Sequence, residues 1–249
     1  MEAADIIDRF AKLYAACSTY HDVGVVNTEG DSAGNVVKFK TYFARPSKFR
    51  FQWTSHHPAF GAERSQTFNI VWSDGIRSRS YYRGDDPEAV EEEEESLELA
   101  IAGATGVSSG AAVNVPALLL VDIRADCRSL LELTDLVLVR EEEIHGHWCY
   151  VVEGGYEIGR RDTELWIDKE SFSLRRISER SEISVSQLQE NDAELERMHR
   201  EHGIALEYKL PPPTKPMKYT DITDYTEVVF DESISDDVFE YKPSDDPRM

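Results

Sequence analysis

The stretch VVKFKTYFARPSKFRFQW, residues 36–53, alternates apolar and polar side chains on both sides of a proline. In each half the aromatic residues share one parity: Phe39 and Phe43 before the proline, and Phe49, Phe51 and Trp53 after it. A period of two is typical of strands with one buried face, and Arg45-Pro46-Ser47 is typical of a turn. The stretch therefore predicts two paired strands that bury an aromatic face.

The same period of two recurs on both sides of this pair. Further predicted strands cover residues 23–27, 67–72, 76–82, 135–140, 147–153, 162–168, 174–182, 217–230 and 238–242. Turn signals such as Asp74-Gly75 separate the strands at short intervals. Such spacing favours one antiparallel sheet over alternating strand–helix–strand units.

Three other segments follow a helical period. Apolar residues spaced three and four apart from Ile6 to Cys17 predict an amphipathic N-terminal helix. Residues 97–123 predict two short helices joined by a flexible Gly/Ser loop. Residues 186–202 predict a polar helix, which a stiff proline-rich linker over residues 210–216 follows.

These elements predict a single domain over residues 1–249, mainly β with added α. A curved antiparallel sheet has a concave face, which the N-terminal helix and the short helices can fill. The many Ala and Gly residues of 97–123 leave room and permit motion, as in a lid. The pattern therefore predicts a partly vacant cavity for an apolar ligand. The candidate lining residues are Phe39, Phe43, Phe49, Phe51, Trp53, Leu118 and Leu119.

The charge of the chain excludes some functions. With 27 Lys and Arg against 48 Asp and Glu, the formal net charge is −21, whereas nucleic-acid binding needs a basic face. Docking on anionic lipid headgroups is disfavoured for the same reason. Nine acidic residues within 85–98 and ten within 221–249 predict a solvated loop and a solvated C-terminal edge rather than interaction tails. No apolar run reaches the ~18 residues of a transmembrane helix.

The candidates for metal or disulfide chemistry are few. Cys17, Cys127 and Cys149 are too scattered for a disulfide framework or a zinc ribbon, although one bridge stays open. His145, His147 and Cys149 have a spacing that a metal could use on a strand. Because Gly146 stands where a hairpin should turn, we expect the two histidines to flank the turn and diverge. We predict no cofactor and no metal site.

Signatures of known enzyme classes are missing. The chain contains no Walker sequence, no dinucleotide-binding glycine fingerprint and no His-Glu-x-x-His. Carboxylates are so abundant that an acid–base pair chosen from the sequence would be arbitrary. We therefore expect a protein that is not an enzyme, while a hydrolase or metal enzyme stays open as an alternative.

The order of these elements resembles the LolA/LolB-like lipoprotein carriers of the bacterial cell envelope. The marks of the resemblance are the opening helix, Tyr42-Phe-Ala-Arg45-Pro46, Phe49-Arg-Phe51, Ser73-Asp74-Gly75 after a strand that ends in Trp72, the lid segment, Glu164-Leu-Trp-Ile-Asp168, and the final Phe239-Glu-Tyr-Lys-Pro243. The resemblance spans roughly Ala4 to Pro243. It implies an incomplete β-barrel of about eleven strands, with helices as a lid, that carries lipids or lipid-modified proteins. It also implies that Arg45 helps to keep the lid shut and that Phe49 and Phe51 line the cavity.

We therefore expect a monomeric, non-enzymatic carrier or chaperone that holds an acyl chain, or the lipid anchor of a lipoprotein, beneath a lid closed by Arg45. Envelope proteins would be its partners, and the resemblance implies a periplasmic or cell-envelope location. A natural start at Met1, which no leader follows, predicts the cytoplasm instead. A sensor or protein-interaction module on the same scaffold is the alternative, and it would use the convex face of the sheet or the polar helix.

Overall fold

The computed structural model describes residues 1–31, 34–56, 66–83, 91–120, 129–157, 159, 161–201 and 212–241. Within these residues, eleven strands form one antiparallel sheet in the spatial order β6-β5-β4-β3-β2-β1-β11-β10-β9-β8-β7. The strands are β1 (Thr19–Gly30), β2 (Val36–Ala44), β3 (Lys48–His56), β4 (Gln66–Asp74), β5 (Ser78–Arg83), β6 (Glu91–Glu94), β7 (Thr134–Ile144), β8 (His147–Gly155), β9 (Thr163–Asp168), β10 (Leu174–Ile183) and β11 (Met217–Phe230). The helices are α1 (Ala3–Ala16), α2 (Leu97–Val107), α3 (Ala111–Asn114), α4 (Pro116–Leu119) and α5 (Val185–Glu201), with short 3₁₀ turns η2 (Leu130–Glu132) and η3 (Asp236–Phe239).

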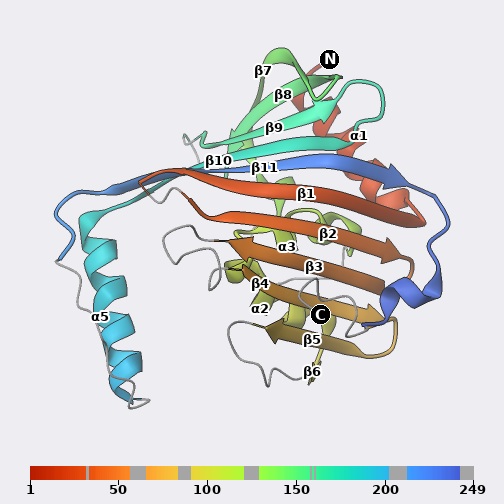
Figure 1. Ribbon diagram of the computed structural model, residues 1–249. Helices are drawn as coiled ribbons and strands as arrows, with labels where there is room; N and C mark the ends of the chain where they lie inside the picture. Colours follow the sequence, from red (N-terminus) through yellow and green to blue (C-terminus); the bar gives the residue numbers. More distant parts are fainter. Residues whose placement is uncertain are drawn as a thin grey trace.

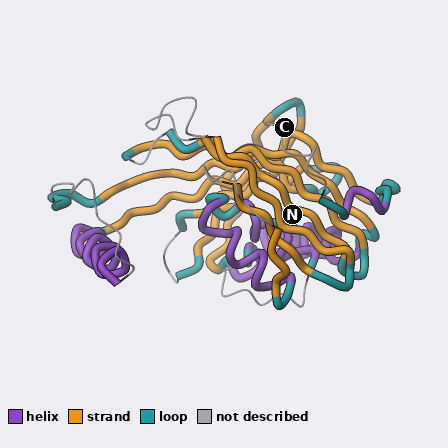
Figure 2. Tube along the Cα trace, turned by 60° about the horizontal axis from the view of Figure 1, so that its bottom comes forward, coloured by secondary structure: helices purple, strands orange, loops and turns teal. Residues whose placement is uncertain are grey.

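The first and last strands of the sheet in chain order, β1 and β11, pair at its middle. β1 pairs with β2 on one side and with β11 on the other, both antiparallel. Figures 1 and 2 show the sheet curving over α1–α4, which all lie on its concave face. The outermost strands of the described sheet, β6 and β7, do not pair with each other. The predicted fold class, an incomplete barrel of eleven strands with helices inside, is confirmed.

Helix α1 lies on the concave face because its apolar residues fall on one side. Ile6, Phe10 and Tyr14 are fully buried, at the spacing of three and four that predicted the helix. The ring of Tyr14 packs edge-on against Phe230 at 5.0 Å, and its hydroxyl accepts a hydrogen bond from the Leu174 backbone N–H at 3.1 Å. One helix face thus contacts both the closing strand and β10.

The lid segment forms three short helices rather than the two that the sequence predicts. Helix α2 begins after Ser96, whose hydroxyl accepts a hydrogen bond from the Leu99 backbone N–H. Gly110 then takes a left-handed conformation, φ +80°, that a glycine adopts without strain. Pro116 opens a separate turn of helix, α4, since proline suits the first helical position. Residues 121–123 of the predicted lid lie outside the described part.

The C-terminal segment packs on the convex face, where we predicted a last strand over residues 238–242. That prediction is wrong: Asp236–Phe239 form the 3₁₀ turn η3. Tyr241 lies on an outward-facing apolar cluster that includes Trp72 and Tyr81, and its ring stacks on Tyr81 at 4.9 Å. Two rows of the β4 side chains are therefore buried, one on each face of the sheet.

The acidic run contains an edge strand, whereas we predicted a solvated loop. Glu91–Glu94 pair with β5, and the side chain of Glu91 forms an ion pair with Arg79 at 3.0 Å. Most of β6 is exposed. Glutamates are tolerated in this strand because one side of an edge strand faces solvent, and charge there discourages pairing with a second chain.

Helix α5 projects from the end of β10 and stands away from the sheet in both views (Figures 1 and 2). Its range, Val185–Glu201, confirms the predicted polar helix. Residues 210 and 211 of the predicted proline-rich linker lie outside the described residues. In the part of the chain that the structure describes, no helix has the length and apolar character that crossing a membrane requires.

Candidate functional site

The concave face of β2 and β3 forms an aromatic wall. Antiparallel pairing places Phe39 opposite Trp53 and Phe43 opposite Phe49, so that side chains of equal parity meet. The ring centroids of Phe51 and Trp53 lie 5.2 Å apart. Seven predicted lining residues belong to one core cluster and are at most 2% exposed: Phe39, Phe43, Phe49, Phe51, Trp53, Leu118 and Leu119.

The lid helices fill the space beneath this wall. The lid residues that enter the same core are Ala100, Ile101, Ala104, Ala111, Ala112, Val115, Leu118, Leu119 and Leu120. We expected the apolar trough to be partly vacant; among the described residues, α1 and the lid belong to the same buried cluster as the aromatic side chains. The lid is therefore closed on the wall.

Arg45 joins the sheet, α1 and the lid. Its guanidinium donates to carbonyl oxygens at the end of α1, namely those of Tyr14 (3.1 Å), Ala15 (2.6 Å) and Cys17 (2.7 Å). The carbonyl groups of the last turn have no partner within a helix, and the helix dipole favours a cation there. The third nitrogen donates to the carbonyl oxygen of Leu119 in α4 at 3.3 Å. One side chain thus bridges the two helical layers where the resemblance places a latch.

A second polar contact holds the lid between α2 and α3. The side-chain amide of Asn35, which precedes β2, donates to the Ser109 hydroxyl at 3.1 Å. The lid is also attached by apolar contacts, which include Ile101, Leu118 and Leu119. Arg45 gives the lid a charge-assisted hydrogen bond, whereas the bond from Asn35 joins two neutral groups.

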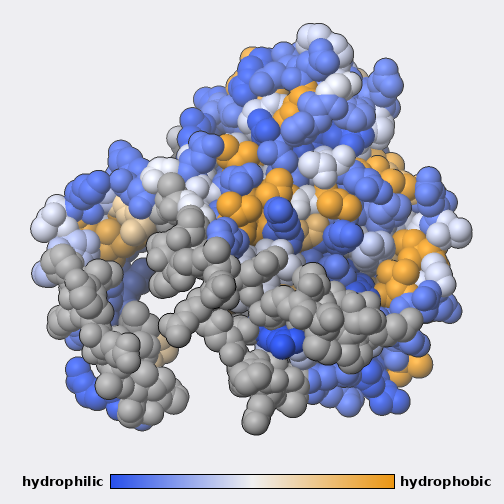
Figure 3. Space-filling view, in the orientation of Figure 1, coloured by the Kyte–Doolittle hydropathy of each residue, from blue (hydrophilic) through white to orange (hydrophobic). Residues whose placement is uncertain are grey.

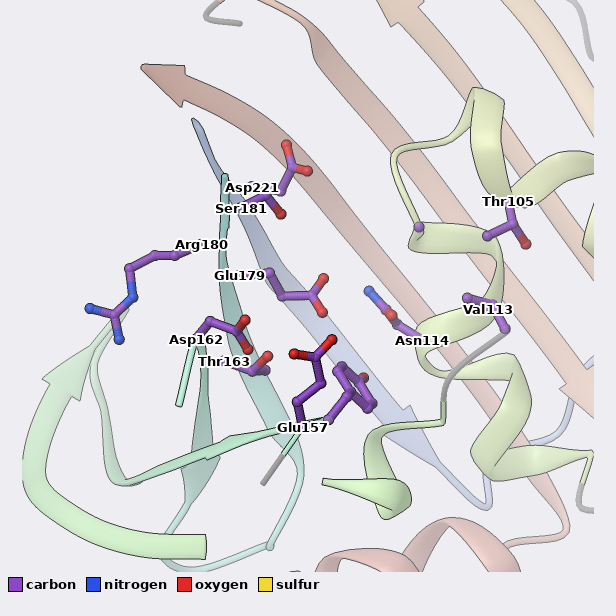
Figure 4. Close-up of a pocket in the computed structure, with 12 residues that line it drawn as sticks. Thr105, Val113, Asn114, Glu157, Asp162, Thr163, Glu179, Arg180, Ser181 and Asp221 are labelled. Carbon is purple, nitrogen blue, oxygen red and sulfur yellow. The ribbon is translucent and has the colours of Figure 1, made fainter. Parts of the chain in front are cut away.

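A polar pocket opens where the lid meets β9–β11. It has a volume of about 350 Å³ and is lined on the lid side by Thr105, Gly110, Val113 and Asn114. The opposite wall, from the strands and the loop before β9, consists of Tyr156, Glu157, Asp162, Thr163, Glu179, Arg180, Ser181 and Asp221. Figure 4 shows Glu179, Glu157 and Asn114 pointing toward the same space.

The carboxylates of this pocket perturb one another. Burial, together with the smaller effects of the charges of Asp221 and Asp162, raises the pKa of Glu179 to about 7. Burial also raises the pKa of Asp221, although that carboxylate accepts a hydrogen bond from the Thr28 hydroxyl at 2.5 Å. Our sequence reasoning missed this pocket. The sequence did contain one indication of it. Glu179 lies two residues after the buried Ile177, so both side chains point to the same face of the strand.

The convex face carries an apolar groove of about 390 Å³ across β1–β4 and β11. Its lining includes the outward side chains of Val23, Val25 and Phe68, flanked by Lys38 and Lys40. Figure 3, which views this face, shows apolar residues gathered near its centre within a hydrophilic surround. The groove lies on the opposite side of the sheet from the aromatic wall.

The histidines and cysteines do not come together. His145 and Gly146 form the β7–β8 turn with positive φ, and His145 contacts Asp224 at 3.2 Å. His147 instead contacts Asp168 at 2.8 Å, so the prediction that the two rings diverge is confirmed. Burial raises the pKa of the Cys149 thiol to about 12, which disfavours a nucleophilic thiolate.

Two further observations concern metals and disulfides. Cys17 and Cys149 are both free and buried, and Cys127 lies outside the described residues. Among the described residues, no group of three or more His, Cys, Asp or Glu side chains is placed to hold a metal ion.

Comparison with known proteins gives matches in structure alone. No protein-family model matches the chain, and a search of curated proteins found no match either. The chain is similar in fold to LolA superfamily proteins. One of these, from Nitrosomonas europaea, matches at 10% identity and a TM-score of 0.30, over 97% of this chain and 98% of that chain.

Two other solved structures are similar in chain path. The lipoprotein LppX of Mycobacterium tuberculosis matches at 13% identity and a TM-score of 0.46, over 94% of this chain and 97% of that chain. MucB of Pseudomonas aeruginosa, solved with MucA, matches at 12% identity and a TM-score of 0.45, over 96% of this chain and 61% of that chain. The lipid modification of LppX and the partner of MucB are properties of those proteins.

Proposed function

We propose that the chain acts as a single, monomeric, non-enzymatic carrier domain that holds an acyl chain between the sheet and the lid. The acyl chain would belong to a lipid or to a lipidated protein, and we place the carrier in the cell envelope. The observation that carries this proposal is Arg45, which connects α4 to the C-terminal end of α1 across the edge of the aromatic wall. The lid helices pack on the sheet without being part of it, so the lid can open without unfolding the sheet.

Replacing lid side chains in the core by an acyl chain is energetically favourable. When α4 alone moves out, Leu118 and Leu119 leave the core, and burying a leucine side chain is worth about 1.5–3 kcal/mol. Two such residues therefore account for about 3–6 kcal/mol. An acyl chain that buries ten methylenes gains ~8 kcal/mol at ~0.8 kcal/mol each. The ligand thus offsets the loss of these lid contacts, and the reaction requires no catalytic group.

The lid test uses Arg45→Leu. Removing the guanidinium should loosen α4, so that a fluorescent fatty acid enters faster and its dissociation constant shifts about tenfold, the equivalent of one charge-assisted hydrogen bond. Far-UV circular dichroism should stay unchanged because the sheet does not depend on this contact. Stopped-flow fluorescence measures the uptake rate, and equilibrium titration measures the affinity.

The matched control is Arg50→Leu. Arg50 lies on the convex face, where it donates to the carbonyl oxygens of Val238 and Glu240 rather than to the lid. Its loss should leave uptake unchanged. If neither the wild type nor Arg45→Leu takes up the fatty acid, and native mass spectrometry after mild extraction finds lipid-free protein alone, the carrier proposal fails.

A second candidate is a sensor or protein-interaction module without lipid transport. The filled interior favours it, because a closed core presents no internal site. The convex groove between Lys38 and Lys40 offers such a module an outer surface. The uptake experiment separates the two candidates: a protein that stays empty even as Arg45→Leu is an interaction module.

A further inference from the structure

The polar pocket at the lid edge has an unbalanced charge. Four of its lining residues are acidic, namely Glu157, Asp162, Glu179 and Asp221, while Arg180 is the one basic residue among those described as lining it. Figure 4 shows the Arg180 side chain pointing away from the others. Its guanidinium donates instead to Glu153 at 3.0 Å and to the Arg161 carbonyl oxygen at 3.3 Å. Arg180 therefore does not neutralise the carboxylate of Glu179, which faces the pocket.

Glu179 is the acidic residue that lacks compensation. It is partly buried on the concave face, and among the described residues no hydrogen bond or ion pair reaches its carboxylate. Asp221, opposite it on β11, has a hydrogen bond from Thr28 but no cation among the described residues. A buried carboxylate without a partner is costly, and a positively charged ligand would remove that cost.

Asn114 adds an independent indication of a ligand. The residue is 6% exposed, and its side-chain nitrogen has no hydrogen-bond partner among the described residues. Buried polar groups are nearly always hydrogen-bonded, so an unpaired donor that faces a pocket points to a missing acceptor. In Figure 4 this amide reaches from α3 toward Glu179. The pocket thus offers acceptors for a cation and one donor beside them.

We propose that this pocket binds a primary ammonium group with a neighbouring acceptor oxygen, as in the aminoalcohol headgroup of a lipid. Glu179 and Asp221 accept hydrogen bonds from the ammonium, and Asn114 donates one to the oxygen. The assignment to a lipid rests on the proposed carrier function. The ammonium chemistry itself rests on the pocket alone.

The position of the pocket agrees with a headgroup site. Asn114 belongs to α3, whose neighbours Ala111 and Ala112 lie in the apolar core beneath the lid. Thr163 and Tyr156 line the same pocket, and Tyr156 packs against that core. A lipid with its acyl chain under the lid would therefore have its polar end beside Glu179.

The test compares three short-chain lipids with the same acyl chains. Dihexanoyl phosphatidylethanolamine has N–H donors, phosphatidylcholine has a cation without them, and phosphatidylglycerol has neither. Calorimetric titration of the full chain should show about tenfold tighter binding of the ethanolamine lipid than of either other lipid, because charge-assisted hydrogen bonds discriminate at that level. Phosphoethanolamine, which has no acyl chain, is the fourth probe.

Two variants test whether Glu179 and Asn114 cause the preference for the ethanolamine lipid. Glu179→Gln, which keeps the size of the side chain, and Asn114→Ala should each reduce the preference for ethanolamine to less than about threefold. Glu227→Gln, which removes an exposed carboxylate from the convex side of β11, is the control and should preserve it. Thermal melting checks that each variant is folded.

The pH dependence is a second readout. Binding should strengthen between pH 6 and pH 8, as Glu179 loses its proton. The other titratable or charged residues that line the pocket are Asp221 from β11, Asp162 before β9, Glu157 and Tyr156 after β8, and Arg180 on β10 itself; the described lining from α2 and α3 contains none. Glu179→Gln should therefore flatten the profile.

The outcomes separate this inference from the carrier proposal. Equal binding of all three lipids overturns the headgroup site and leaves the carrier intact. Binding of phosphoethanolamine, with no gain from the acyl chains, supports the ammonium site and overturns the carrier. Failure of both phosphoethanolamine and the ethanolamine lipid to bind overturns the inference.

Discussion

Asp22 places a carboxyl group inside the core, where it is 1% exposed. It accepts hydrogen bonds from the Tyr20 hydroxyl at 2.7 Å and from the Thr41 backbone N–H at 3.0 Å. Burial raises the pKa of Asp22 to about 7, against the effect of those hydrogen bonds. Between pH 4 and pH 7 the folded chain therefore retains a proton that the unfolded chain releases.

This proton predicts a stability that falls as the pH rises. Because the pKa of Asp22 is about 3 above its ordinary value of 3.8, the contribution of Asp22 to the free energy of unfolding should drop by about 4 kcal/mol between pH 4 and pH 7, and level off above. Asp22→Asn removes this contribution and leaves that of Glu179, while the amide of the variant can still accept from Thr41 and contact Tyr20. Urea unfolding should show the variant more stable than wild type at pH 8 and equal to it near pH 4. The exposed Asp8→Asn should keep the wild-type slope; equal slopes in all three proteins would contradict the assignment.

Gly24 is the residue at which β1 allows the aromatic wall to form. A β-carbon there would overlap Cζ of Phe39 and lie 2.8 Å from the carbonyl oxygen of Asp224. Gly24→Ala should destabilise the fold by about 1–3 kcal/mol, the usual cost of overpacking. Gly106→Ala, where a β-carbon meets no atom within 4 Å on helix α2, should stabilise by up to about 1 kcal/mol. Thermal melts compare the two.

A double variant tests whether the Phe39 ring causes the destabilisation by Gly24→Ala. Combining Gly24→Ala with Phe39→Leu removes the ring that the new methyl would strike, so the double variant should recover part of the loss. If the double variant loses as much stability as the two single variants together, the strain lies at Asp224 instead. If Gly24→Ala does not change the stability, the packing argument is contradicted.

At the scale of elements, local patterns predicted most of the fold. The period of two in residues 36–53 found β2 and β3 because both strands bury one face alone. The spacing of Ile6, Phe10 and Tyr14 found α1 for the same reason. A single buried face leaves a periodic trace in the sequence, and such a trace can be read without knowing the partner.

The elements that sequence reasoning missed depend on distant partners. Glu91–Glu94 have poor strand propensity, and their pairing with β5 comes from the neighbouring backbone. The other edge strand, β7, also carries glutamates at Glu141–Glu143. An acidic run can thus mark a protected sheet edge as well as a loop. Apolar and polar residues alternate in the segment around η3 as they do in a strand. Its position, however, is set by packing on the convex apolar cluster, where Tyr241 contacts Trp72.

At the scale of the molecule, the interior and the pocket are products of assembly. Whether the aromatic wall is vacant depends on how α1 and the lid pack beneath it, which no strand pattern encodes. The pocket joins Asn114 to Glu179 and Asp221, residues far apart in sequence on three elements. The sequence could therefore predict the wall and the latch residue Arg45 as a candidate, but not the polar pocket.

The net charge of −21 makes the molecule as a whole sensitive to salt. Exposed ion pairs such as Lys12–Asp8 contribute little, about 0–1 kcal/mol each, while the excess carboxylates repel one another. Raising NaCl from 0.01 M to 0.15 M shortens the screening length from ~30 Å to ~8 Å, so the melting temperature should rise by a few degrees. Changing Glu92, Glu93 and Glu95 to Gln reduces the net negative charge from −21 to −18 and should make the salt dependence of the melting temperature shallower. Differential scanning calorimetry measures both, and a melting temperature that falls with salt would mean that attractive pairs outweigh the repulsion.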